Sequence, residues 1–281
     1  MTFFTHEITV MGVTVALRAY IPDVSARTSY AEKRPAIVIF PGGGYGFTFS
    51  GEAEPIAMKY AADGICAFVL DYSCAPVRFP IQQLQAFAAI RWVREHAVEF
   101  HIRPDNISTT GFSAGGHLCA CTGTLWNKKA FAPYFAEAGM DDVDVSVYRP
   151  DKLVLCYPVI KAFTKFHHRG SFLGLLGDRA DDEALLKLLA TDEQIDEHTP
   201  PAFIWHTAED FGVPIRNSID FASGLASLYK PVELHIYLHG DHGLCLGTCV
   251  TDDRPFTEPH ESSEWIYKAI RFIYDESIIG K

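Results

Sequence analysis

The arrangement of apolar and polar positions along the chain predicts strands that alternate with helices. Short continuous apolar runs, typical of strands covered on both faces of a sheet, occur at "AIVIF" (36–40) and "ICAFVLDY" (65–72). Further strand-like runs lie at 106–112, 152–158, 202–207 and 232–238. Residues 81–100 repeat apolar positions at spacings of three and four, which is typical of an amphipathic helix, and a closing helix is expected at 263–275. This alternation predicts an α/β fold with a mostly parallel central sheet flanked by helices.

The first residues follow a different pattern from the later strands. Residues 8–20 alternate apolar and polar side chains along one run. Alternation with a period of two is typical of a strand that is buried on one face only. We therefore expect a single antiparallel strand here, at the edge of the sheet.

Two long stretches between the expected strands fit neither pattern. Residues 126–150 are rich in Asp and aromatic side chains, and residues 159–200 contain "GSFLGLLGDRADDEALLKLLA". Long insertions at the functional end of a sheet often form lids, although packing against the rest of the domain is an equally good interpretation. The length of 281 residues and the hydrophobic content of 48% fit a single domain over 1–281, with these two stretches as lid-like insertions.

The charge and the composition of the chain limit the classes of molecule that it is expected to bind. The formal net charge is −11, and the sequence has no cluster of Lys or Arg that would bind phosphate backbones or an anionic surface. We therefore expect neither nucleic acid nor a membrane as a partner. The first residues do not resemble a secretory signal, and no apolar run approaches the roughly 20 residues that span a bilayer. A cytoplasmic protein is expected, and the sequence leaves a homo-oligomer open.

The cysteines are considered as metal ligands and as disulfide partners. The chain has 7 of them, scattered and odd in number, which suits a reducing compartment better than a disulfide framework. Cys245 and Cys249 could bind a metal with His239 and His242, but the sequence has no CxxC pair, which is the usual spacing in a tetrahedral zinc site. We expect neither a metal nor an organic cofactor.

The stretch "GFSAG" (111–115) places Ser113 between two glycines, after an expected strand and before an expected helix. A strand that reverses sharply into a helix leaves no room for side chains two residues on either side of an exposed nucleophile. The alternative is an ordinary small residue at a close strand–helix contact. The strand before and the helix after favour a nucleophilic serine.

A run of glycines follows the strand at 36–40. In "FPGGGYGF" (40–47), Gly43 or Gly44 exposes a backbone N–H that can approach a developing oxyanion, and the N–H of Ala114 can contribute from the other side. A flexible turn is the alternative. A phosphate-binding loop is excluded in its usual form, because no GKS or GKT follows.

Taken together, these pieces resemble the α/β-hydrolase superfamily, and within it the small esterases similar to acetyl-xylan esterases. The resemblance rests on five stretches, which follow one another in the order of the family: "PGGGYGF" (41–47), "LDYSCAP" (70–76), "GFSAGGHL" (111–118), "TPPAFIWHTAEDFGVPIRNS" (199–218) and "HGDHGL" (239–244). It implies the α/β-hydrolase fold and ester hydrolysis through an acyl-enzyme, with the residues in the chain order nucleophile, acid and histidine.

The resemblance aligns His242 with the catalytic histidine. His239 is its nearest competitor and is interpreted as a hydrogen-bonded structural residue. From the residues alone, the acid could be Glu209 or Asp210 after the strand at 202–207, whereas Asp241 is adjacent to His242 and therefore poorly directed toward its ring. The likeness of "AEDFGVPIRNS" to the family's acid turn assigns the role to Asp210.

Three positions depart from the family's pattern. Pro41 stands where related esterases often carry a histidine before the glycines, which suggests that the stiffness of proline fixes this loop. Gln85 and Ala88 occupy positions where the resemblance implies an Asp and an Arg. A structural ion pair is therefore in doubt.

The resemblance favours a small-molecule ester as substrate, with a short acyl group, acetyl above all, on a sugar or another small alcohol. An arylformamidase or a small peptidase on the same three residues, and a non-catalytic small-molecule binder, are the alternatives. Three side chains are candidates for contact with substrate: Tyr45, His167 and Phe172. His117, four residues after Ser113, is interpreted as a structural helix residue.

Overall fold

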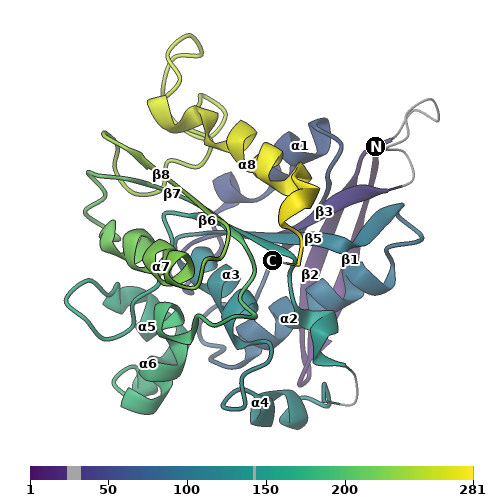
Figure 1. Ribbon diagram of the computed structural model, residues 1–281, viewed down its shortest axis with the longest axis vertical. Helices are drawn as coiled ribbons and strands as arrows, with labels where there is room; N and C mark the ends of the chain where they lie inside the picture. The colour runs from purple at the N-terminus through teal and green to yellow at the C-terminus, as the bar shows by residue number, and fades with distance from the viewer. Residues whose placement is uncertain (24–32, 142–143, 281) are drawn as a thin grey trace.

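The protein is built around one eight-stranded sheet (Figure 1). The computed structural model describes residues 1–23, 33–141 and 144–280. The strand order is β1-β2-β4-β3-β5-β6-β7-β8. The strands are β1 Thr2–Val10, β2 Val13–Ile21, β3 Arg34–Phe40, β4 Cys66–Leu70, β5 Ile102–Phe112, β6 Lys152–Cys156, β7 Ala202–Thr207 and β8 Val232–Tyr237. All pairs from β4 to β8 are parallel, which confirms the predicted mostly parallel sheet.

Helices cover both faces of the sheet. They are α1 Glu54–Ala62, α2 Ile81–Glu95, α3 Ala114–Leu125, α4 Ala132–Glu137, α5 Arg169–Leu176, α6 Glu183–Leu189, α7 Arg216–Ser227 and α8 Trp265–Tyr274. One buried cluster joins alternate strand residues such as Val38 to α2, α3 and α7, and the other joins Ile39 and its neighbours to α1 and α8. Continuous apolar runs therefore occur in the central strands because each face of the sheet has its own core.

The predicted single strand over 8–20 is wrong. The structure has a hairpin there, in which β1 and β2 are antiparallel and Val10 pairs with Val13. Met11 and Gly12 form the turn, with φ of 49° and 79°. A two-residue turn with positive φ at both positions reverses the chain without interrupting the alternation, and the apolar Met11 concealed it.

The two long insertions lie in different places. Residues 126–150 contain α4 and a 3₁₀ helix, Val145–Tyr148, and the ring centroids of Phe131 and Phe135 lie 5.6 and 5.0 Å from that of Phe87 on α2. Residues 159–200 contain α5 and α6. A Cβ placed on Gly174 of α5 would lie 2.1 Å from the carbonyl oxygen of Gly44, so this insertion packs directly on the glycine-rich loop after β3.

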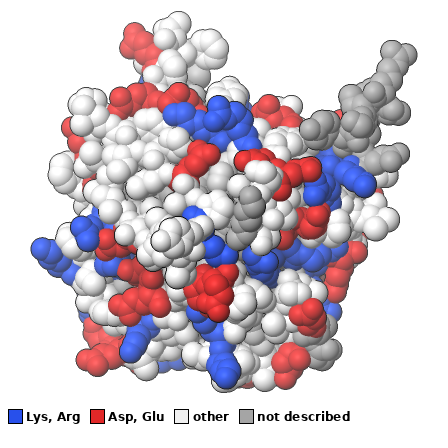
Figure 2. Space-filling view, viewed as in Figure 1, with Lys and Arg blue, Asp and Glu red and all other residues white. Residues whose placement is uncertain are grey.

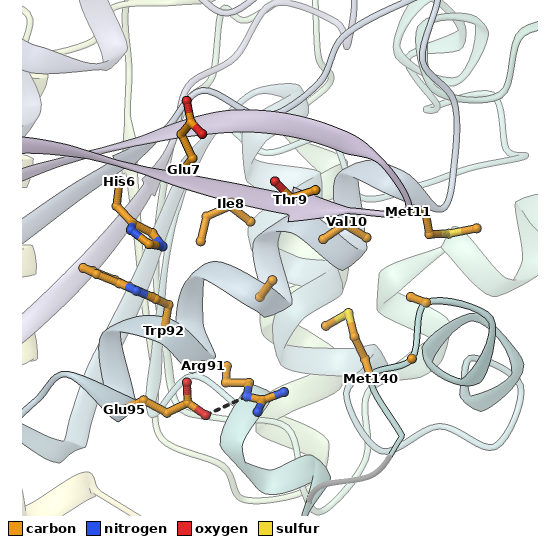
Figure 3. Close-up of a pocket in the computed structure, with 13 residues that line it drawn as sticks. His6, Glu7, Ile8, Thr9, Val10, Met11, Arg91, Trp92, Glu95 and Met140 are labelled. Atoms are coloured by element: carbon orange, nitrogen blue, oxygen red, sulfur yellow. Dashed lines mark hydrogen bonds and ion pairs between the residues drawn. The ribbon is translucent and has the colours of Figure 1, made fainter.

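A pocket of about 350 Å³ lies between β1 and α2, beside residues 138–140 (Figure 3). The indole of Trp92 forms part of its wall. This ring stacks on His6 with centroids 4.3 Å apart and on His96 with centroids 4.2 Å apart, so two imidazole rings already occupy part of its surface.

The surface carries charges of both signs. Acidic and basic side chains are interspersed over the face seen in Figure 2. Within the described residues, no helix combines the length and the apolar character needed to cross a bilayer.

Candidate active site

Ser113 occupies the sharp turn between β5 and α3. Its φ and ψ are 53° and −117°, a backbone conformation that non-glycine residues rarely adopt. Its N–H donates to the carbonyl oxygen of Cys156 at the end of β6, at 3.1 Å. The serine is therefore held at the carboxyl edge of the sheet, where the loops that follow β3, β6, β7 and β8 converge.

The two glycines of "GFSAG" are required by close backbone contacts. A Cβ on Gly111 would lie 2.0 Å from the carbonyl oxygen of Gly115, and a Cβ on Gly115 would lie 2.0 Å from that of Phe40. No side chain fits at either distance. The turn that presents Ser113 therefore depends on glycine at both positions.

His242 lies between Ser113 and Asp210. Its Nε2 is 2.7 Å from the Oγ of Ser113, and its Nδ1 is 2.6 Å from Oδ2 of Asp210. The loop after β8 carries the histidine, and the loop after β7 carries the acid. The structure thus brings together three residues that the sequence separates by up to 129 positions.

Asp210 is almost completely buried. Its Oδ1 accepts hydrogen bonds from the N–H groups of Gly212 and Val213 at 2.9 and 2.8 Å. Its Oδ2 lies 3.1 Å from Nε2 of His206 as well as close to His242. Burial alone would favour the neutral acid, but the hydrogen bonds from His206, His242 and Val213 hold the pKa of this carboxyl well below its usual value.

The competing acids and the competing histidine lie elsewhere. Glu209 and His239 are both exposed and lie 3.2 Å from each other, so each is engaged by the other. Asp241 is exposed to solvent. Asp210 is the carboxylate that reaches the ring of His242.

The glycine-rich loop carries two backbone N–H groups next to Gly42, the glycine that packs against the Ser113 turn. Gly43 and Gly44 have φ of 128° and 63°. Within the described residues, neither of their N–H groups has a hydrogen-bond acceptor. Ala114 is the first residue of α3, and the N–H groups in the first turn of a helix have no partner within the helix. These three N–H groups are the candidates for binding an oxyanion.

Polar side chains hold this loop on both sides of its glycines. The hydroxyl of Tyr72 donates to the carbonyl oxygen of Pro41 at 2.6 Å, and the N–H of Gly42 donates to the carboxylate of Glu52 at 2.6 Å. Proline stiffness is therefore one of several restraints on the loop. Gln85, at the position where an acid was implied, exchanges two neutral hydrogen bonds with Ser73, at 2.9 and 2.8 Å.

Two of the candidate substrate contacts are buried and packed against His117. Tyr45 is 1% exposed, and its hydroxyl donates to Nδ1 of His117 at 2.8 Å. Phe172 is 2% exposed, and its ring centroid lies 5.3 Å from that of His117. Contact with a substrate through Tyr45 would have to involve its backbone. The structural interpretation of His117 fits these contacts.

The third candidate, His167, lies in the insertion, where its Nδ1 is hydrogen-bonded to the carbonyl oxygen of Thr164. The neighbouring His168 interacts electrostatically with His242 and Asp210. Burial lowers the pKa of His168, and the charge that His242 can carry lowers it further. His168, which directly precedes α5, therefore lies near His242 and Asp210.

Three residues of the site were not found by sequence reasoning: Glu52, Tyr157 and His206. His206 sits within "IWHTAED", four residues before Asp210, but a strand histidine in an apolar run gives no signal of its partner. Glu52 and Tyr157 contact each other across 105 positions of sequence, with no motif at either end.

Comparison with known proteins places this geometry in context. The model of the BD-FAE family matches residues 22–225, a range that includes Ser113 and Asp210 but ends before His242. A crystal structure of an acetyl ester-xyloside bifunctional hydrolase from Caldicellulosiruptor lactoaceticus superposes with a TM-score of 0.79. It is 36% identical, and the match covers 95% of this chain and 90% of that one.

Two curated relatives are longer than this chain. Endo-1,4-beta-xylanase B of Butyrivibrio fibrisolvens is 34% identical over 233 residues, which are 80% of this chain and 35% of the relative. An acetylxylan esterase of Xylanibacter ruminicola is 31% identical over 217 residues, 76% of this chain and 42% of the relative. The chain therefore spans less than half the length of either of these two proteins.

Proposed function

The chain belongs to the BD-FAE family and has the α/β-hydrolase fold, and from this premise we propose that it is a serine carboxylesterase. The proposed substrates are short-chain acyl esters, acetyl above all, of sugars or other small alcohols. The observation that carries the proposal is the continuous hydrogen-bonded chain from Ser113 through His242 to the buried Asp210.

The proposed reaction begins with a proton transfer from Ser113. Nε2 of His242 accepts the hydroxyl proton while Oγ attacks the ester carbonyl, and Nδ1–H of the same ring donates to Asp210. The tetrahedral intermediate collapses when His242 returns the proton to the leaving alcohol. Water then attacks the acyl-enzyme by the same route, releasing the acid and restoring Ser113.

The oxyanion of each tetrahedral intermediate is bound by backbone groups. The N–H of Ala114 donates from the start of α3, and the N–H of Gly43 or Gly44 donates from the loop after β3. Fixed donors of this kind stabilise the charge that develops on the carbonyl oxygen without reorganising during the reaction.

Asp210 acts as the partner of the imidazolium. Its lowered pKa keeps the carboxylate ionised beside His242, so it stabilises the positive ring formed during the reaction without accepting the proton. Its burial keeps water away from this contact, which strengthens the attraction.

The substrate class and the location are the finer parts of the proposal. Two of the similar proteins are described as an acetylxylan esterase and an acetyl ester-xyloside hydrolase, which favours acetylated sugars. We further propose residues 159–200 as a lid over the site and His167 as a contact for the substrate. All seven cysteines are free, which fits a reducing compartment and favours the cytoplasm.

The test is the reaction of the purified protein with a fluorophosphonate, followed by intact mass and peptide mapping. We expect one adduct, on Ser113, and its loss in Ser113→Ala together with the loss of p-nitrophenyl acetate hydrolysis. A folded Ser113→Ala variant with wild-type turnover contradicts the proposal. An unlabelled wild-type protein indicates a binder, and faster turnover of formamides or peptides than of esters indicates another reaction at the same triad.

A further inference from the structure

A second carboxyl group, that of Glu52, is buried beside the triad and takes no part in the steps above. Glu52 ends a 3₁₀ helix, Ser50–Glu52, and is 2% exposed. Its Oε2 accepts from the N–H of Gly42 at 2.6 Å, and its Oε1 accepts from the hydroxyl of Tyr157 at 2.7 Å. A buried carboxyl group is costly unless donors satisfy it, so both contacts stabilise the local structure.

Tyr157 connects Glu52 to the loop that carries the histidine. It directly follows β6, and its hydroxyl oxygen accepts from the N–H of Cys245 at 3.1 Å, three residues after His242. Its ring packs edge-on against the His242 ring, with centroids 5.1 Å apart. The hydroxyl group of Tyr157 therefore connects the segment after β3, which contains Glu52, to the loop after β8, which contains His242.

The other end of the restraint is packed against the nucleophile. A Cβ on Gly42 would lie 2.7 Å from Oε2 of Glu52, 2.8 Å from the carbonyl oxygen of Phe112 and 3.1 Å from Cβ of Ser113. Gly42 is thus wedged between Glu52 and the serine turn. A shift of Glu52 must move Gly42, and with it the N–H of Gly43, the next donor in the chain.

The charge of Glu52 fits this arrangement. Burial raises the pKa of the Glu52 carboxyl, and the hydrogen bonds from Tyr157 and Gly42 and the positive charge of His242 oppose that rise. The electrostatic link to His242 indicates that the carboxyl lies near the His242 ring as well as near the glycine-rich loop (40–47), which we call the oxyanion loop.

We propose that Glu52 and Tyr157 are positioning residues, which hold the oxyanion loop and the His242 loop in one fixed geometry around Ser113. The proposal rests on the proposed function. Neither residue touches the substrate. They keep the backbone N–H donors and the His242 base aligned on the same tetrahedral intermediate. A displacement of the donors or of the base by less than about 1 Å already impairs this alignment.

The test uses Glu52→Gln, Tyr157→Phe and the double variant, with Tyr148→Phe as the matched control. Tyr148 is also a fully buried tyrosine, and its hydroxyl donates to the carbonyl oxygen of Met140 at 2.9 Å, on the α2 side of the molecule. Each variant is assayed for kcat and KM on p-nitrophenyl acetate, for the rate of fluorophosphonate labelling of Ser113, and for the midpoint of thermal unfolding.

Tyr157→Phe is expected to lower kcat and the labelling rate by about tenfold each, less than the loss of a whole oxyanion donor, with KM changed by less than about threefold. Glu52→Gln is expected to lower kcat by about 10- to 100-fold. In the double variant, kcat should fall by less than the product of the two single effects, because the pair acts as one unit. Tyr148→Phe should lose thermal stability and keep its kcat.

Folded Glu52→Gln and Tyr157→Phe proteins with wild-type kcat and labelling rates overturn the positioning role, as does an equal loss of kcat in Tyr148→Phe. If Glu52→Gln does not fold, Tyr157→Phe alone decides, because it keeps the ring that packs on His242. An unlabelled Ser113 in the wild-type protein overturns the proposed function and this inference with it, whereas labelling at an unchanged rate in both variants overturns the inference only.

Discussion

His206 donates to the same oxygen of Asp210 that receives the hydrogen bond from His242. Nε2 of His206 lies 3.1 Å from Oδ2 of Asp210 and 2.9 Å from the carbonyl oxygen of Val213. A carbonyl oxygen can only accept, so Nε2 carries the hydrogen, and Nδ1 then accepts from the hydroxyl of Ser218 at 2.8 Å. The acid is therefore held from two sides by imidazole rings, only one of which faces the serine.

This contact predicts that His206→Phe lowers kcat without large change in KM. Phenylalanine keeps most of the ring volume but removes the donor that fixes the plane of the Asp210 carboxylate. We expect a loss of about tenfold, small beside the loss of about 10⁴-fold for a neutralised triad acid. Ser218→Ala, which leaves Nε2 of His206 in place, is the graded control and should lose less. Equal activity of His206→Phe and the wild-type protein would contradict the prediction.

The identity of the acid predicts a ranking of three conservative variants. Asp210→Asn should lower kcat by about 10⁴-fold, because the amide cannot stabilise the imidazolium and favours the wrong tautomer of His242. Asp241→Asn and Glu209→Gln change exposed side chains and should change kcat much less. The measurement is kcat on p-nitrophenyl acetate, with folding checked by circular dichroism. If Glu209→Gln or Asp241→Asn lowered kcat by several orders of magnitude while Asp210→Asn changed it little, the role of the acid would pass to that other residue.

The features that could be predicted from sequence are those governed by local sterics. The glycines around Ser113 are demanded by backbone contacts within a few residues of the serine and by the neighbouring strand, so the spacing itself carries the information. The continuous apolar strands likewise follow from a sheet covered on both faces. The β1–β2 hairpin was missed because Met11 in its turn is apolar and preserved the alternation.

The missed residues of the site depend on contacts that no spacing records. Glu52 meets Gly42 and Tyr157 only because β3 and β6 end at the same edge of the sheet. Tyr45 follows the glycines that were expected to bind the oxyanion, and only the structure places its hydroxyl on His117 rather than at the mouth of the site. Such placements arise from the packing of distant elements, which one sequence without its fold does not reveal.

The buried His117 predicts a loss of stability in mild acid. Burial lowers its pKa from 6.5 to about 4, and the hydrogen bond with the carbonyl oxygen of Leu189 opposes part of the shift. Between these two pH values the unfolded chain binds a proton that the folded chain does not, so stability rises with pH in this window and is lost as the pH falls. Protonation also removes the acceptor that Nδ1 offers to Tyr45.

The loss attributable to His117 should reach about 3 kcal/mol by the acid end of this window. The check is urea unfolding from pH 7 downward, with His117→Gln beside the wild-type protein. The variant should be less stable at neutral pH but should lose less stability on acidification. His198→Gln, at an exposed histidine, should follow the wild-type curve. If the free energy of unfolding fell equally with pH in His117→Gln and the wild-type protein, a group other than His117 would be responsible for the loss of stability in acid.

The contact between α5 and the oxyanion loop predicts a strong effect of one methyl group. A Cβ on Gly174 would lie 2.1 Å from the carbonyl oxygen of Gly44, so Gly174→Ala must push the loop or the helix aside. We expect kcat to fall by about 10- to 100-fold, because the donors at Gly43 and Gly44 lose their alignment. Gly170→Ala on the same helix is the control, since its nearest atom is a side-chain atom, Cε1 of His168, at the wider distance of 3.3 Å. Similar losses in both variants would point to an effect on α5 alone.

The same contact predicts a preference for short acyl groups. The insertion is also held to the segment that precedes α2, because Arg78 donates to the carbonyl oxygen of Gly174 at 2.5 Å and the N–H of Phe79 donates to that of Leu175 at 2.9 Å. Because Gly174 of α5 also packs against the carbonyl oxygen of Gly44, we expect little room for a long acyl chain beside the carbonyl that reacts with Ser113. In a series of p-nitrophenyl esters with one leaving group, kcat/KM should fall from acetyl and propionyl to octanoyl by at least about 100-fold, since each methylene that finds no pocket costs about 1–3 kcal/mol. A preference for octanoyl esters would instead indicate an open, lipase-like acyl pocket and would require α5 to move away from Gly44 when substrate binds.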